Sequence, residues 1–360
     1  MVDGSLKLPM SRFVGLLFLG LIAVMPMRAS AFEAKRAGQE SYLTRAIFAD
    51  GRLWVLSDAG DLSYIAEGRD MRVEETLPEP VFDLCKRDGH PAVITGVREG
   101  GSAWTLRRRV NGTWSVAATI ETEGNALRAV DCAAERVTLL TSRRLIDIGT
   151  DHQSAVVLSD KLNAGLISST YGAADQFFVG INAGEWGGGL RRIDRRSGKV
   201  TMIERNATGE LCGGPLNSSC DPVNGIAPEP WKPGCIAVAV GLIHLQPHGR
   251  VVEVCADQVE RLYSKPHGGN ASSGHGSGDE PFSSVPFFGI TREGDTLWAV
   301  GIDGVYNVGP SGSAYSIPLP GFKDVGGIKV SFDLPQFILV LTNVNQRLSL
   351  SGSVPIPVPR

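Results

Sequence analysis

The sequence has little net charge and few motifs that point to catalysis. Its 35 basic and 38 acidic residues leave a net charge of −3. It therefore lacks the basic face that nucleic acid or an anionic membrane would require as the main partner. It also lacks a P-loop, a dinucleotide-binding glycine motif and a Ser-His-Asp arrangement. These absences argue against the enzyme classes that such motifs mark, and they leave the pattern of apolar residues as the main source of information.

Long apolar runs are absent except for one near the N-terminus. This run of 13 residues follows Lys7 and Arg12 and precedes Ala29-Ser30-Ala31, the small-residue pattern of a signal-peptide cleavage site. An uncleaved membrane anchor is the alternative, but a spanning helix needs roughly 20 apolar residues. We predict a signal peptide at residues 1–31 and a periplasmic or secreted location for the remaining chain.

Apolar residues at helical spacing are also nearly absent. Short strand-like runs bounded by Gly, Pro, Asn and Asp recur instead, and one strand-turn-strand phrase appears at Gly51 to Ile65, Asp175 to Ile203 and Gly294 to Val308. A repeat of about 40 residues is typical of a β-propeller, in which each four-stranded blade must stack on its neighbours. We predict an all-β fold, a seven-bladed β-propeller over residues 32–360.

The count of seven comes from the second strand expected in each blade. These strands centre near seven residues: Trp54, Ile94, Leu139, Phe178, Val238, Trp298 and Ile338. Most steps are close to 40 residues, but 60 residues separate Phe178 from Val238 and Val238 from Trp298. The last strand contains Pro355 and Pro357, which predicts an edge strand because proline cannot donate to a neighbouring strand.

The two long steps contain insertions at residues 206–221 and 265–281, which we interpret as crossovers between blades. In a propeller such crossovers emerge on the same face as the turn between a blade's second and third strands. We therefore expect them beside the turns at 182–188 and 244–249. Loops on a rigid scaffold commonly bind ligands. The candidate ligand-binding residues are Asn182, Glu185, Trp186, His244 and His248.

These residues also have structural interpretations. Glu185 and Trp186 would hydrogen-bond and stack a sugar ring or a cation; alternatively, the glycines around them only supply positive φ and the tryptophan covers the blade edge. His244 and His248 would contribute to a zinc site only if both imidazoles shared a face. A hairpin does not provide that arrangement, so we expect solvent-facing histidines.

Six cysteines in a chain with an export signal predict disulfide bonds. Cys235 opens the second strand of blade five and Cys255 closes the third, so the two should face each other across a hairpin. Sequence alone leaves other connectivities open, and two further pairs follow from position. They are Cys212 with Cys220 inside one loop and, by elimination, Cys85 with Cys132 between blades two and three, if the distance permits.

Residues 174–203 resemble the repeats of two-component-regulator-type propellers, and residues 50–66 and 292–308 do so more weakly. The matching residues are Phe177 to Gly180, Gly188 to Asp194 and Ser197 to Lys199. In that family the propellers are extracytoplasmic sensor parts of membrane kinases that bind ligand on a face of the ring. Because no kinase region follows here, the resemblance implies a free-standing exported version that acts in ligand binding or as a scaffold.

The sequence therefore predicts a binding module for a small molecule, a glycan or a partner protein, with no cofactor and no evident catalysis. Nucleic acid is not an expected partner, nor is the chain expected to be an integral membrane protein. The alternative is a calcium-dependent hydrolase or lactonase, which needs oxygen ligands that converge at the central channel. Candidates on the innermost strands are Asp83, Asp131, Asn224 and Asp324.

Overall fold

The computed structural model describes the chain from residue 43 to residue 360 with gaps at 67, 69–71, 98, 134–135, 151, 163–165, 206–211, 244–246, 268–282, 320–327 and 343–354. The predicted signal peptide, His244 and Asp324 lie outside the described residues. Ser41–Arg360 form one compact unit. Within the described ranges, no helix has the length and apolar character to span a membrane.

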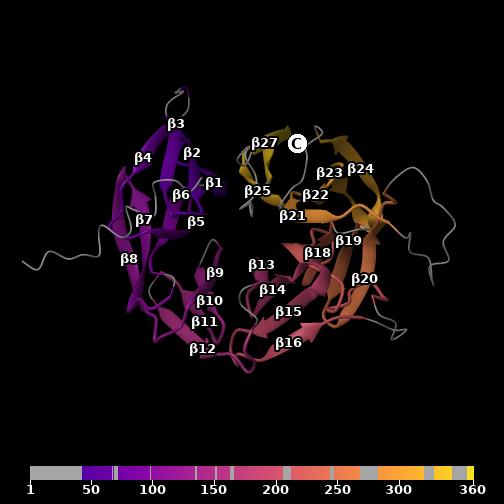
Figure 1. Ribbon diagram of the computed structural model, residues 1–360, viewed down its shortest axis with the longest axis horizontal. Helices are drawn as coiled ribbons and strands as arrows, with labels where there is room; N and C mark the ends of the chain where they lie inside the picture. The colour runs from indigo at the N-terminus through magenta and orange to yellow at the C-terminus, as the bar shows by residue number, and fades with distance from the viewer. Residues whose placement is uncertain are drawn as a thin grey trace, which may run out of the picture. The chain divides into compact units, whose positions relative to one another are not determined.

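The strands form seven antiparallel sheets, or blades, each built from one continuous stretch of chain (Figure 1). Blades one to three contain β1 (Leu43–Ala49), β2 (Arg52–Ser57), β3 (Leu62–Ala66) and β4 (Arg72–Glu75); β5 (Val81–Arg87), β6 (His90–Gly96), β7 (Ala103–Val110) and β8 (Thr113–Glu121); and β9 (Leu127–Cys132), β10 (Val137–Thr141), β11 (Arg144–Ile148) and β12 (Gln153–Val157).

Blades four to six contain β13 (Ile167–Gly172), β14 (Gln176–Asn182), β15 (Gly188–Asp194) and β16 (Val200–Ile203); β17 (Val223–Pro228), β18 (Cys235–Leu242), β19 (His248–Cys255) and β20 (Gln258–Tyr263); and β21 (Phe287–Glu293), β22 (Thr296–Gly301), β23 (Gly304–Val308) and β24 (Ala314–Pro318). Blade seven has three described strands, β25 (Ile328–Leu334), β26 (Phe337–Thr342) and β27 (Pro355–Pro359). Two short 3-10 turns, η2 (Gly184–Trp186) and η3 (Pro310–Gly312), interrupt the connections.

The blades follow one another around a closed ring. The first strand of each blade packs beside the first strand of the next, from β1 and β5 through to β21 and β25, and β25 packs against β1 again. The unit is therefore a seven-bladed β-propeller, which confirms the predicted fold class and the number of blades. β27 is the edge strand of its described sheet, as its prolines predicted.

The second strand of each blade explains why the sequence revealed the count. All seven residues chosen as markers lie on second strands. In β6, β14 and β18 the burial pattern is a continuous buried run, because blades cover both faces of such a strand. The fourth strands β8 and β12 are mostly exposed at the rim. The apolar runs that repeat in the sequence are thus the second strands, which are covered on both faces by neighbouring blades.

The hydrophobic core is divided into clusters that lie between neighbouring blades. One cluster joins blades two and three around Trp104 and Leu139, and another joins blades four and five around Phe178 and Val238. Blades seven and one meet through the smallest described cluster, whose buried members are Ala46, Val55, Leu339 and Leu341. No strand is exchanged between blades in the described sheets. Packing of side chains therefore closes the ring, together with a hydrogen bond from the Ser331 hydroxyl to the Ala46 carbonyl.

Three disulfides connect the six cysteines in the predicted pairs. Cys235–Cys255 joins directly opposed positions of β18 and β19, with 4.4 Å between the Cα atoms. Cys212–Cys220 closes a loop within the crossover from blade four to blade five. Cys85–Cys132 joins β5 to β9, and its Cα separation of 6.1 Å lies within the ordinary range for a disulfide. Three bridges of this kind indicate an exported protein.

Candidate functional site

The turn between β14 and β15 packs against the crossover that leads from blade four to blade five. The N–H groups of Gly188 and Gly189 donate to the carbonyl oxygens of Ser218 and Asp221, each over 2.8 Å. On the same face, the N–H of Ser284 in the next crossover donates to Pro247 over 3.0 Å. The described parts of the two crossovers therefore each pack against the neighbouring turn, which is the pairing of crossover and turn that the sequence predicted.

Glycines make this close packing feasible. Gly187 has φ 78°, and a Cβ atom there would lie 2.4 Å from the carbonyl oxygen of Ser218. Asn182 fixes the start of the turn, since its Oδ1 accepts a hydrogen bond from the N–H of Gly184 over 2.8 Å. The glycine at 187 therefore admits the chain's own crossover. It does not leave that position open for a ligand.

Trp186 projects from the tip of this turn. Its residue surface is 79% exposed, so the ring does not cover the blade edge. Glu185 beside it is also exposed. The structure thus places an aromatic ring and a carboxylate next to each other at the surface, on a turn whose backbone is hydrogen-bonded to a second segment. Because the backbone of the turn is already fixed, a side chain on it would lose little conformational entropy on contact with another molecule.

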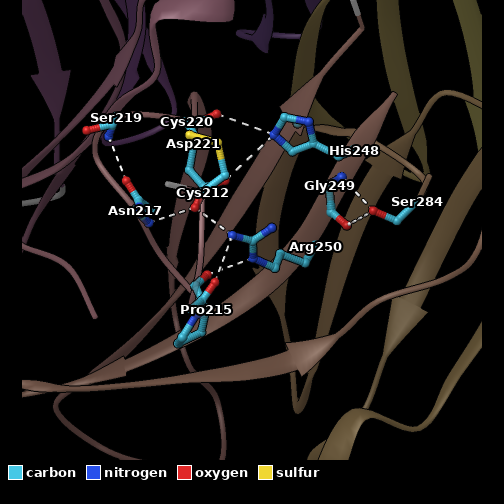
Figure 2. A network of polar contacts seen from close by, with 12 residues as sticks. Cys212, Pro215, Asn217, Ser219, Cys220, Asp221, His248, Gly249, Arg250 and Ser284 are labelled. Atoms are coloured by element: carbon cyan, nitrogen blue, oxygen red, sulfur yellow. Dashed lines mark hydrogen bonds and ion pairs between the residues drawn. A yellow bond between two sulfur atoms is a disulfide. The ribbon is translucent and has the colours of Figure 1, made fainter. Parts of the chain in front are cut away.

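A buried ion pair holds the crossover against blade five (Figure 2). Arg250 on β19 is 4% exposed and its Nη2 lies 2.5 Å from Oδ2 of Asp221, which is 1% exposed. Arg250 also donates to the carbonyl oxygens of Pro215 over 2.7 Å and Gly214 over 3.2 Å. The N–H of Asn217 donates to the same Asp221 oxygen over 2.7 Å. The guanidinium therefore binds three points of one loop.

His248 is the first residue of β19 and leans toward the same loop (Figure 2). Its Nε2 lies 3.3 Å from the carbonyl oxygen of Cys220 and 3.7 Å from Oδ1 of Asp221. Its side chain is 29% exposed. The imidazole thus contacts the crossover. It is only partly exposed, whereas the sequence predicted a histidine that faces solvent.

Polar groups surround the base of the Trp186 turn. The hydroxyl of Ser218 donates to Oε2 of Glu204 over 2.6 Å. Arg191 on β15 donates to the carbonyl oxygen of Leu190 over 3.1 Å, and burial lowers the pKa of its guanidinium, an effect that Glu204 opposes. We use the name Trp186 surface for Glu185, Trp186, Arg191, Glu204 and Ser218. It combines an exposed aromatic ring with charges of both signs.

Two asparagines predicted to contact ligands have internal partners. Nδ2 of Asn182 donates to Oδ1 of Asn224 over 2.6 Å. Nδ2 of Asn224 donates in turn to the carbonyl oxygens of Gly241 and Phe287, over 2.7 and 2.9 Å. These bonds link blades four, five and six, and they use both amide hydrogens of Asn224.

Two of the candidate calcium ligands, Asp83 and Asp131, are carboxylates within the described residues, and each lies near an arginine. Oδ1 of Asp83 on β5 lies 3.4 Å from Nε of Arg45. Asp131 on β9 accepts a 3.4 Å hydrogen bond from Thr170. Burial raises the pKa of Asp131, whereas the positive charges of Arg195 and Arg45 lower it. Asp83 and Asp131, both on inner strands, are therefore each influenced by a positively charged arginine.

Asp221 and Arg250 hold the inserted loop in place, and neither was predicted from the sequence as a site residue. One signal was available: β19 reads His-Gly-Arg-Val-Val-Glu-Val-Cys, and an arginine within a run this apolar needs a counter-charge. Asp221 follows directly after a cysteine of the inserted loop. The pairing itself depends on how the loop folds back across 29 residues, which spacing alone does not reveal.

No family model matches the chain, and no curated protein matches it in sequence. Solved structures match its fold. A catalytically inactive variant of virginiamycin B lyase from Staphylococcus aureus, solved with quinupristin, gives a TM-score of 0.54 at 12% identity, covering 86% of this chain and 94% of that one. YCF48 from Cyanidioschyzon merolae gives 0.52 at 12% identity, with coverage of 86% and 94%; another structure has YCF48 bound to a D1 peptide, with a TM-score of 0.51 at 10% identity.

The extracellular domain of a one-component system from B. thetaiotaomicron is also similar. Its TM-score is 0.50 at 14% identity, covering 86% of this chain and 38% of that one. At such identities the likeness shows the fold alone. That structure is the extracellular domain of a bacterial regulatory system, so the resemblance suggested by the repeats is confirmed at the level of the fold.

Proposed function

We propose that this protein is an exported binding module that holds a peptide segment of a partner protein on the Trp186 surface. The observation that supports this most directly is a tryptophan that is 79% exposed on a braced turn. Large aromatic residues often dominate binding energy at protein interfaces. A ring that is already held in place loses little conformational freedom on binding.

The surroundings of Trp186 favour a peptide over a small molecule. The ring projects outward, and the charged groups around it have both signs, as at the polar rim of an interface. The fold also gives weak support, because YCF48, which is similar in fold, has been solved with a bound peptide. A glycan would also stack on an exposed indole, so the experiment must distinguish the two ligand classes.

The experiment begins with selection of a random peptide display library on the immobilised protein. Enriched peptides are then measured against Trp186→Ala and against Tyr315→Ala, a matched control that removes another exposed aromatic on β24. We expect Trp186→Ala to weaken binding by about 1 to 3 kcal/mol and Tyr315→Ala to have no effect. Peptides that bind both variants as well as the parent protein would contradict the proposal. Binding on a glycan array in place of peptides would assign the site to sugars.

The calcium-dependent hydrolase is the second proposal and has less support. Its described carboxylates, Asp83 and Asp131, have arginine neighbours whose positive charge disfavours a cation, and Asn224 is engaged by other residues. Measuring the calcium content of purified protein, followed by titration with Ca²⁺ in the calorimeter, tests this proposal. Stoichiometric binding that Asp83→Asn or Asp131→Asn abolishes would favour it.

A further inference from the structure

A second cluster of reactive groups lies at the other end of the strands that carry His248. In the β18–β19 hairpin, Leu242 pairs with His248 at one end and Cys235 pairs with Cys255 at the opposite end. The β17–β18 turn beside this disulfide carries Glu229 and Lys232. The cluster is therefore on the opposite face of the ring from the Trp186 surface and is independent of the proposed function.

A buried acid lies against this disulfide. Glu229 is 3% exposed, and one of its carboxyl oxygens and the Sγ atoms of Cys235 and Cys255 all lie within 4.8 Å of one another. Both cysteines are only partly buried. A carboxyl group and an accessible sulfur–sulfur bond thus share one small space.

The charges around Glu229 determine its protonation. Burial, together with the neighbouring carboxyl of Glu253, raises the pKa of Glu229 to about 8. Lys232 compensates the charge of Glu253, with Nζ and Oε1 separated by 2.6 Å. At neutral pH, Glu229 is therefore a protonated acid beside a carboxylate that is already neutralised.

The hairpin does not depend on the bridge to keep its strands together. Eight residue pairs connect β18 and β19, from Cys235 opposite Cys255 to Leu242 opposite His248. The bridge can open while the strands remain hydrogen-bonded. The two cysteines are reached through their own partly exposed surface. A cavity of about 380 Å³ near the turn that carries Glu229 is lined by Trp231, Lys232, Glu253 and Glu260, among others.

We propose that Cys235–Cys255 is a thiol–disulfide exchange site that accepts electrons from a dithiol, and that Glu229 supplies the proton to the leaving sulfur. A thiolate of the dithiol attacks one Sγ, the sulfur–sulfur bond breaks, and the other Sγ leaves and takes the carboxyl proton of Glu229. The second thiol of the dithiol then attacks the mixed disulfide, the remaining Sγ leaves and takes the proton of that thiol, and Glu229 regains a proton from solvent. The dithiol ends as a disulfide and the protein ends with two thiols.

Protonation of Glu229 helps this step in two ways. It provides an acid next to the leaving sulfur, and it removes a negative charge that would repel the incoming thiolate. Ionisation of Glu229 removes both effects. The rate of exchange per thiolate should therefore fall as the pH rises through about 8.

Dithiothreitol is the probe for the full chain. The oxidised protein is mixed with it at several pH values, quenched with an alkylating reagent and analysed by mass spectrometry for each disulfide. Glu229→Gln should slow reduction of Cys235–Cys255 at pH 7 by at least about tenfold, since general acids commonly contribute that much or more. Glu260→Gln, a matched change at an exposed acid that lines the nearby cavity, should leave the rate unchanged.

Reduction of Cys212–Cys220 in the same samples serves as the internal control, and Glu229→Gln should not alter its rate. Equal rates at Cys235–Cys255 in the parent protein and in Glu229→Gln would overturn the proposal. If that variant does not fold, the parent protein alone decides. A rate per dithiothreitol thiolate that stays constant between pH 7 and 9 would also overturn it.

Discussion

At the scale of single residues, Glu229 makes the stability of the protein depend on pH. Its carboxyl has a pKa of about 8 in the folded chain and roughly 4.3 when unfolded. Between these values the folded chain keeps a proton that the unfolded chain has released. The stabilisation that the bound proton of Glu229 contributes to the free energy of unfolding is therefore complete below the unfolded pKa. It is lost as the pH rises through the folded pKa.

We predict that the free energy of unfolding falls from about pH 5 to pH 8 and that Glu229→Gln flattens this dependence, because glutamine does not titrate. Urea denaturation at several pH values measures both. The exposed acid at position 260 supplies the control, since Glu260→Gln should retain the slope of the parent protein. A slope that persists in Glu229→Gln would assign the pH dependence to other groups.

At the scale of elements, the crossover between blades four and five depends on the Asp221–Arg250 pair. Asp221→Ala would leave the Arg250 guanidinium buried at 4% exposure without its carboxylate. We predict a loss of about 3 to 5 kcal/mol in the free energy of unfolding, the usual cost of an unpaired buried charge. Chemical denaturation measures it. Asp221→Ala combined with Arg250→Met should recover part of the loss, whereas no recovery would show that the charge is not the cause.

The elements also show what the sequence was able to predict. The second strands were found because blades cover both faces, which produces continuous apolar runs such as Ile236 to Val240. The pairing of Cys235 with Cys255 followed from the hairpin register. The roles of Asn182 and Asn224 did not follow, since their bonds cross between blades, and the sequence contains no local mark of which polar residues meet there.

At the scale of the whole propeller, the interface between blades seven and one has the smallest buried cluster among the described joints. Its buried cluster has four members, Ala46, Val55, Leu339 and Leu341, whereas blades two and three share twelve. We predict that amide hydrogens of β1 and β26 exchange faster than those of β18 and β19, because a smaller buried cluster opens at lower cost. Hydrogen exchange with mass spectrometry measures this, and uniform protection around the ring would contradict it.

The interface between blades seven and one is also the last to form during synthesis, so its apolar surface on blade one stays uncovered longest. Blade one is synthesised before the other blades. The residues that cover its face toward blade seven, Leu339 and Leu341, come almost 300 residues later. Until blade seven exists, Ala46 and Val55 present an uncovered sheet face to the surroundings. A chain that stops short of β26 would keep that face exposed, and its first blade would be the part that recruits chaperones or aggregates.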